Sequence, residues 1–191
     1  MIEQTIGKKN QPAVDPGIAA RGMHMPANIY KALAWLLAIG YSAALSQIPA
    51  ENFKDFSNYL IYAEYSWSRL LWFLDRGVLE TLGNEPVWLM INAALGALLP
   101  PEAVVRTIIF ASSTLVAGNV LRAKPDKFVW LVLFLMLPIV LKNHLIHLRQ
   151  GLAVAFFLWG WFSSHRFVRL ALIALTPFIH ASFFFVLLVF G

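Results

Sequence analysis

The sequence predicts an all-α, polytopic integral membrane protein with about five to six membrane helices and one further helix that is interfacial or re-entrant. Of its 191 residues, 59% are hydrophobic and 13% are charged, whereas soluble domains average roughly 45 to 50% and about 25%. Several apolar runs also approach the ~20 residues that a helix needs to cross a bilayer. No soluble fold fits this composition.

The chain divides into a polar tail and a membrane domain. Residues 1–28 carry Lys8, Lys9 and Arg21 and contain no apolar run, which is typical of a loosely ordered segment. The tail is too long and too polar before the first apolar run to resemble a signal peptide. We expect residues 1–28 to be a cytoplasmic tail and residues 29–191 to be the polytopic membrane domain.

Five apolar runs account for the predicted membrane helices. The first two are long enough to cross a bilayer at ~1.5 Å per residue. The third extends toward Leu148, the fourth is short, and the last contains Pro177, which is expected to kink or break its helix. The runs occupy residues 29–46, 103–121, 128–141, 151–162 and 167–190.

The segment 47–102, between the first two spans, holds most of the acidic residues. Within it, residues 87–99 are rich in apolar side chains but shorter than a crossing helix. The preceding Asn84-Glu85-Pro86 resembles a helix N-terminus, since Asn caps free amides and Pro is tolerated in the first turn. We therefore expect an interfacial or re-entrant helix here, within an outer-face segment.

The distribution of basic residues supports this topology. If residues 87–99 do not cross, the positive-inside rule places the clusters at 122–127 and 165–169 on the cytoplasmic side; if they cross, both clusters face outward. The net charge of +5 is thus explained by the orientation of the helices in a membrane, with the N-terminus on the cytoplasmic side. No nucleic-acid partner is expected.

The residue inventory limits the chemistry available. The chain has no cysteine, so disulfides and thiol nucleophiles are excluded. A glycine-rich phosphate loop, a metalloprotease helix and a hydrolase elbow are also missing from the sequence. His144 and His147 have the spacing of a metal pair on a helix, but without a third ligand a polar loop end is the favoured interpretation. We expect neither cofactor nor metal.

Four ionisable residues are candidates for a site on the predicted outer face. Arg149 lies beside two apolar spans, where a charge is costly unless it meets water, a partner or an anion, and its planar fork suits phosphate oxygens. Snorkelling to the interface is the alternative. His180 suits proton transfer or structural hydrogen bonding. Asp55 and Glu85 suit general-base roles, or simple roles as a surface charge and a helix-start residue.

Several short motifs resemble the EpsG-type family of Wzy-like polysaccharide polymerases, over roughly residues 53–191. Each motif is short, but their order and spacing within an apolar chain are fairly specific. They comprise Asp55 with Tyr59, Glu85 with Pro86, Asn143 followed by Arg149, Gln150 and Ala153, and His180 with Ser182.

The resemblance implies a glycosyltransferase that joins repeat units carried on undecaprenyl pyrophosphate for capsule, exopolysaccharide or O-antigen. Arg149 would hold the pyrophosphate leaving group, and His180 or Asp55 would be the base. Substrate contacts would come from Tyr59, Glu85, Asn143, Gln150 and Ser182. Expected partners are the lipid-linked oligosaccharide, membrane lipids and other polysaccharide-assembly membrane proteins. Because such polymerases usually continue for several more helices, we expect an N-terminal portion.

Two other functions fit the same residues. A non-catalytic membrane helper or transporter fragment would bind an anionic lipid through Arg149. Another transferase acting on lipid-linked sugars, such as a ligase or an acyltransferase, would differ in its product. It would form a single capped glycan or an acylated sugar, whereas a polymerase forms a ladder of lengthened glycans.

Overall fold

The computed structural model describes residues 26–49, 53 and 55–190. These residues form ten α-helices and a short 3₁₀ turn, with no β-strand among them, so the all-α prediction is confirmed. The elements are α1 (Ala27–Ser46), α2 (Phe56–Arg76), α3 (Val78–Gly83), α4 (Pro86–Gly96), α5 (Pro101–Ala123), η2 (Pro125–Lys127), α6 (Phe128–Leu135), α7 (Pro138–Leu145), α8 (Leu148–Trp161), α9 (Arg166–Ile179) and α10 (Phe183–Phe190).

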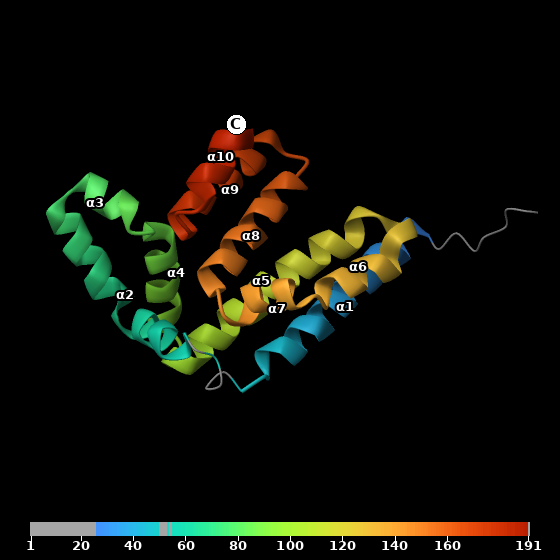
Figure 1. Ribbon diagram of the computed structural model, residues 1–191, viewed down its shortest axis with the longest axis horizontal. Coiled ribbons are helices and arrows are strands. Elements are labelled where there is room, and N and C mark those ends of the chain that lie inside the picture. The colour runs from blue at the N-terminus through green and yellow to red at the C-terminus, as the bar shows by residue number, and fades with distance from the viewer. Residues whose placement is uncertain (1–25, 50–52, 54, 191) are drawn as a thin grey trace, which may run out of the picture.

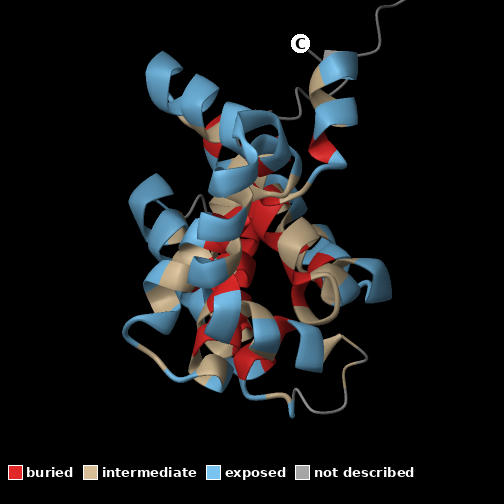
Figure 2. Cartoon of the chain, turned by 90° about the vertical axis from the view of Figure 1, so that its left-hand side faces the viewer, coloured by how far each residue is buried: buried red, intermediate tan, exposed pale blue. Residues whose placement is uncertain are grey.

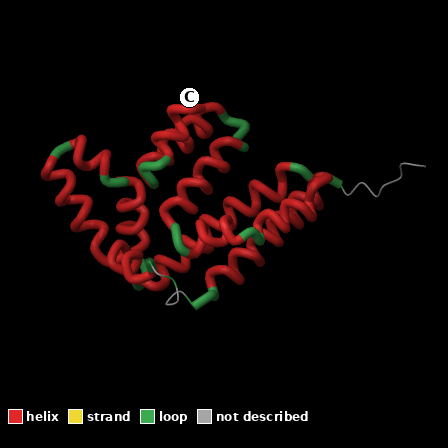
Figure 3. Tube along the Cα trace, viewed as in Figure 1, coloured by secondary structure: helices red, strands yellow, loops and turns green. Residues whose placement is uncertain are grey.

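Helix α5 is the central element of the bundle. It packs along α1 on one side and against α8 on another, and α9 covers α8. Helices α2 and α4 form a separate pair that contacts α5 and α9. Figure 1 shows α1, α5 and α6 side by side, with α2, α3 and α4 at the other end and α8 to α10 between them; the tube in Figure 3 follows the same path. The α2–α4 pair therefore meets α8 and α9 near the middle of the molecule.

Two helices, α1 and α5, are long and apolar enough to cross a membrane, and both coincide with predicted spans. The predicted run 128–141 is instead divided into α6 and α7, which are bent by 66° at a short break. Pro138 begins α7, and a proline cannot donate the backbone hydrogen bond that would continue α6. Counting this bent pair as one span gives three candidate spans by length and composition.

The apolar run 167–190 is also divided. Helix α9 ends at Ile179, two residues after Pro177, and α10 begins at Phe183. The Thr176 hydroxyl donates to the Ile173 carbonyl at 2.7 Å, which satisfies the oxygen that Pro177 leaves without its usual donor. His180 lies in the turn between these two helices, where its side chain and the backbone N–H of Ala181 contact another element.

Helices α2 and α4 pack closely because small residues lie between them. The buried stripe of α2 repeats every three to four residues and includes Tyr59, Ala63 and Leu70. A Cβ atom at Gly96 of α4 would lie 2.4 Å from the Ala63 carbonyl oxygen, so only glycine permits this approach. The close contact fixes the position of α4, and hence of Glu85 just before it.

Many large apolar side chains are exposed on the bundle, and its mainly apolar interior also holds ten buried polar side chains among the described residues. Leu79 and Phe167 are each 87% exposed and Leu188 is 82% exposed, while Ser112 and Thr176 are fully buried. Figure 2 shows the buried residues running through the middle of the bundle and the exposed ones around it. Small and hydroxyl residues between helices, with large apolar residues outside, are typical of packing in lipid.

Candidate functional site

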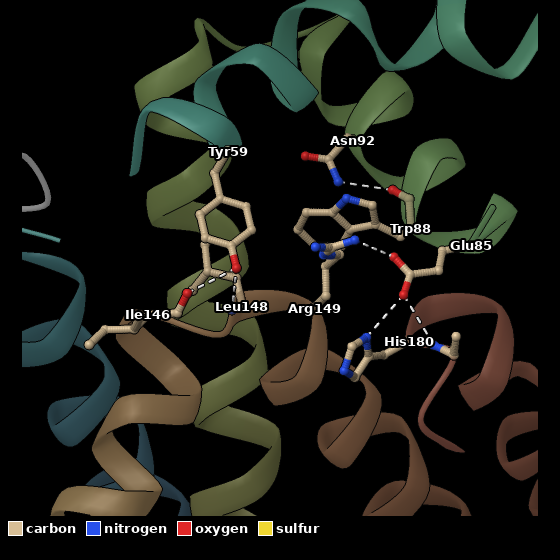
Figure 4. Close-up of polar contacts among 9 residues, drawn as sticks. Tyr59, Glu85, Trp88, Asn92, Ile146, Leu148, Arg149 and His180 are labelled. Atoms are coloured by element: carbon tan, nitrogen blue, oxygen red, sulfur yellow. Dashed lines mark hydrogen bonds and ion pairs between the residues drawn. The ribbon is translucent and has the colours of Figure 1, made fainter. Parts of the chain in front are cut away.

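The site is built around Glu85, which joins α3 to α4. Its backbone is in the left-handed region, with φ 53° and ψ 55°, and it is the one non-glycine residue with positive φ among those described. Pro86 follows at the first position of α4, and a residue before proline is disfavoured in the right-handed helical region. Such strained backbone is uncommon outside turns and functional sites. The turn directs the carboxylate toward α8 and α9 (Figure 4).

Both oxygens of the Glu85 carboxylate are engaged. Arg149 Nη1, from the first turn of α8, donates to Oε2 at 2.7 Å. Oε1 lies 3.0 Å from His180 Nδ1 and accepts a hydrogen bond from the Ala181 backbone N–H at 3.1 Å. Figure 4 shows the carboxylate between the guanidinium and the imidazole. We refer to Glu85, Arg149 and His180 as the Glu85 cluster.

The Glu85 cluster keeps its carboxylate ionised. The side chain of Glu85 is 12% exposed, and this burial opposes ionisation. The hydrogen bonds with His180 and the Ala181 N–H, together with the charge of Arg149, outweigh burial and lower the pKa of Glu85 below its ordinary value of 4.5. An ionised carboxylate accepts hydrogen bonds only, so His180 Nδ1 carries a proton and Nε2 remains able to accept one when the ring is neutral.

Tyr59 positions the start of α8 through its hydroxyl. The group donates to the Ile146 carbonyl at 2.9 Å and accepts from the Leu148 N–H at 3.1 Å. These two contacts attach the turn before Arg149 to α2 (Figure 4). Tyr59 is only 7% exposed and packs edge-on against Trp88 of α4. The hydroxyl is therefore used within the protein, and Tyr59 acts as a positioning residue.

Asn143 and Gln150 lie where α7 meets α8. A Cβ atom at Gly151 would be 2.2 Å from the Asn143 carbonyl oxygen, so the two backbones touch and only glycine fits. The side chains of Asn143 and Gln150 are half-buried and make no hydrogen bond with the Glu85 cluster among the described residues. This contact sets the direction of α8, and hence the place of Arg149.

The remaining predicted residues lie outside the cluster. Asp55 precedes α2, one turn before Tyr59, and its carboxylate makes no ion pair within the described ranges. Ser182 is exposed in the turn after His180. The structure thus brings Arg149 and His180 each into direct contact with Glu85 and places Tyr59 at the start of α8. Asp55 and Ser182 make no contact with Glu85 among the described interactions.

A cavity of about 240 Å³ opens beside Arg149. Its lining includes a second arginine, Arg69, and the ring of Tyr62, both from α2. The guanidinium carbon of Arg69 lies 4.7 Å from the centroid of that ring and that of Arg149 lies 5.5 Å from it. Neither Tyr62 nor Arg69 was predicted as a site residue. Their spacing of two helical turns puts both on one face of α2, and this spacing could have indicated from the sequence that they lie together.

The two histidines that have metal-pair spacing lie in different elements. His144 is buried at the end of α7, whereas His147 lies in the turn before α8. Across the described ranges, no group of three or more His, Cys, Asp and Glu side chains could hold a metal ion.

The arrangement offers a cation with unused donors, an imidazole oriented by a carboxylate, and an adjoining cavity. A guanidinium carries five N–H donors, and Arg149 uses Nη1 toward Glu85. These groups suit stabilisation of an anionic leaving group and transfer of a proton. No protein-family model matches the chain, and neither a curated protein nor a solved structure matches it.

Proposed function

We propose that the chain is a membrane glycosyltransferase that polymerises oligosaccharide repeat units carried on undecaprenyl pyrophosphate. The observation that supports this most is that Arg149 and His180 both contact the Glu85 carboxylate directly. Each comes from a different motif of the resemblance to EpsG-type polymerases, and Arg149 and His180 lie 64 and 95 positions from Glu85. Their meeting in one cluster fits a shared catalytic role.

The membrane arrangement belongs to the same proposal. Helices α1, α5 and the bent α6–α7 pair cross a bacterial cytoplasmic membrane, and α8 and the α9–α10 pair complete about five membrane helices. The strongly exposed apolar side chains of α9 and α10, such as Phe167 and Leu188, support contact with lipid. With 11 residues, α4 is too short to cross and serves as the interfacial or re-entrant helix. The Glu85 cluster then faces the outer surface.

The proposed reaction transfers a growing glycan from its lipid carrier to the next repeat unit. A hydroxyl oxygen of the acceptor sugar forms a bond to the anomeric carbon of the donor, and the bond from that carbon to the diphosphate oxygen breaks. The lipid diphosphate leaves with the electron pair. The N–H donors of Arg149 that do not face Glu85 stabilise the negative charge that develops on the departing lipid diphosphate.

His180 is the proposed base. Nε2 takes the proton of the acceptor hydroxyl, while the Glu85 carboxylate holds the Nδ1 side of the ring and stabilises the imidazolium that forms. The sequence left His180 and Asp55 as alternatives. His180 is favoured because it contacts Glu85 directly, whereas Asp55 makes no ion pair within the described ranges.

The test is expression of the chain in a host that lacks its own repeat-unit polymerase, followed by electrophoresis of the lipid-linked glycans. We expect a ladder of lengthened glycans that disappears in Arg149→Ala and persists in Arg76→Ala. Arg76 is a suitable control because it is exposed on α2 and stacks on Trp72 at 3.6 Å, away from the Glu85 cluster. A single capped glycan, an acylated sugar or unchanged single units would contradict polymerisation.

A further inference from the structure

We propose that Arg69 and Arg149 together bind a diphosphate group in the cavity beside the Glu85 cluster. The site recognises the diphosphate itself, whether free or at the head of an isoprenoid lipid. It rests on the proposed function only for the identity of the lipid that carries this group. Arg69 would thus be a second binding residue, in addition to the Arg149 that the motifs indicate.

The charges around the cavity favour an anion. Arg69 and Arg149 both line it, and Glu85 is the one carboxylate among the lining residues. Glu85 is paired with Arg149 at 2.7 Å, whereas no carboxylate lies within 4.0 Å of the Arg69 guanidinium in the described part of the chain. A half-buried guanidinium without a carboxylate partner leaves the cavity with excess positive charge. An anionic ligand would compensate that charge.

The geometry suits a ligand that has two phosphate groups. The guanidinium carbons of Arg69 and Arg149 lie 4.7 and 5.5 Å from the centroid of the Tyr62 ring, and both residues line the same cavity, so an anion bound in that cavity meets both side chains. A volume of about 240 Å³ corresponds to roughly eight water-sized groups, which is the size class of a diphosphate. Phe73 and Leu89 provide an apolar wall. A guanidinium fork binds phosphate oxygens with paired, charge-assisted hydrogen bonds.

Arg76 provides a matched comparison on the same helix. Arg69 and Arg76 are two turns apart on α2, and each stacks on an aromatic ring, Tyr62 and Trp72 respectively. Only Arg69 lines the cavity, and Arg76 is exposed. Substituting either residue removes one positive charge and one stacking contact. A difference in anion binding between the two variants therefore reports on the cavity.

The experiment is calorimetric titration of the purified full chain in detergent with inorganic diphosphate. We expect Arg69→Gln to weaken binding by about tenfold or more, because one charged partner is lost, and Arg76→Gln to bind like the wild type. Inorganic monophosphate should bind the wild type at least about tenfold more weakly, since it engages one guanidinium. Equal binding by Arg69→Gln, or no binding by the wild type, would overturn the inference.

Two further measurements separate the possible failures. A short-chain prenyl diphosphate should lose affinity in Arg69→Gln by the same factor as the inorganic ion; loss for the prenyl ester alone would show that Arg69 contacts another part of the ligand. The glycan ladder tests the proposed function separately. If diphosphate binding requires Arg69, the site is supported even when no ladder forms. If a ladder forms but diphosphate binding does not require Arg69, polymerisation is supported and the site is refuted. Thermal melting without ligand checks that both variants fold.

Discussion

Replacing Glu85 with glutamine tests whether the Glu85 cluster joins three helices. The amide has nearly the same shape as the carboxylate but carries no charge, and one of its two terminal groups is a donor. If its oxygen continues to face His180 and the Ala181 N–H, its NH₂ group faces the Arg149 guanidinium, which is also a donor. Glu85→Gln thus removes the hydrogen bond and ion pair that Glu85 makes with α8 and leaves its hydrogen bonds with His180 and the Ala181 N–H.

The size of the effect follows from exposure. A hydrogen bond to a charged group contributes about 1.5 to 3 kcal/mol to stability. The Glu85 side chain is 12% exposed but that of Arg149 is 36% exposed, so water partly replaces the lost partner. We therefore expect the free energy of unfolding to fall by roughly 1 to 2 kcal/mol. At about 2 to 4 °C per kcal/mol for a chain of this size, the Tm falls by roughly 2 to 8 °C.

Thermal unfolding in detergent, followed by tryptophan fluorescence, measures this change. Glu80→Gln is the control, because Glu80 is exposed on α3 and makes no ion pair within the described ranges. A double variant with Arg149→Gln should lose little more stability than either single variant, since both remove one contact. The reasoning is refuted if Glu85→Gln and Glu80→Gln melt together, or if the two single losses simply add.

Three other predictions concern the surroundings of the cluster. Tyr59→Phe leaves a buried backbone N–H and carbonyl without the hydroxyl, so denaturant titration should show a loss of about 1 to 3 kcal/mol; an unchanged midpoint contradicts this role. Gly151→Ala should lower the free energy of unfolding by about 1 to 3 kcal/mol or more, because the added Cβ atom overlaps the Asn143 backbone. Gly40 has open space around it, so Gly40→Ala should be at least as stable as the wild type. Equal melting temperatures of the two variants would argue against the α7–α8 contact. Because the pKa of Glu85 is lowered on folding, its stabilisation is complete above its ordinary value of 4.5 and is lost as pH falls through the lower folded value; the Tm should decline there, and less in Glu85→Gln.

Local sequence patterns predicted the helices well where a long apolar run determines the structure. The apolar runs at α1 and α5 are long and uninterrupted, and both form the candidate spans that hydropathy indicates. Pro86 also begins a short helix as expected, but the N-cap is Glu85, and the side chain of Asn84 donates to the Glu80 carbonyl instead of capping α4. At α1 and α5 the sequence pattern and the backbone preference agree, so tertiary contacts add little to the prediction.

Prolines lie at the interruptions of two predicted runs: the prediction of one continuous helix over 128–141 was wrong, whereas the kink or break expected at Pro177 is confirmed. Pro138 lies inside the predicted run 128–141, and Pro177 inside 167–190; each marks a missing backbone donor, but sequence alone does not decide between a kink and a complete break. The structure has a bend of 66° at the first run. At the second, a non-helical turn brings His180 to Glu85, and this contact was not foreseen.

The site itself depends on contacts that short-range patterns do not encode. Motif resemblance selected Glu85, Arg149 and His180 separately, but their contact joins positions 64 and 95 residues apart. Arg69 was overlooked because it belongs to no motif, and its value comes from the cavity that folding creates. The left-handed backbone of Glu85 is likewise unexpected, since a non-glycine residue rarely adopts it.

Reconstitution in liposomes tests the central claim most directly. The purified chain is mixed with a repeat unit linked to undecaprenyl pyrophosphate, and the lengthened glycan and the released carrier lipid are measured together. The account predicts that wild type and Arg76→Ala produce both in equal amounts and that Arg149→Ala produces neither. Equal release by Arg149→Ala, or no lengthened glycan from the wild type, would contradict a glycosyl transfer that depends on the Glu85 cluster.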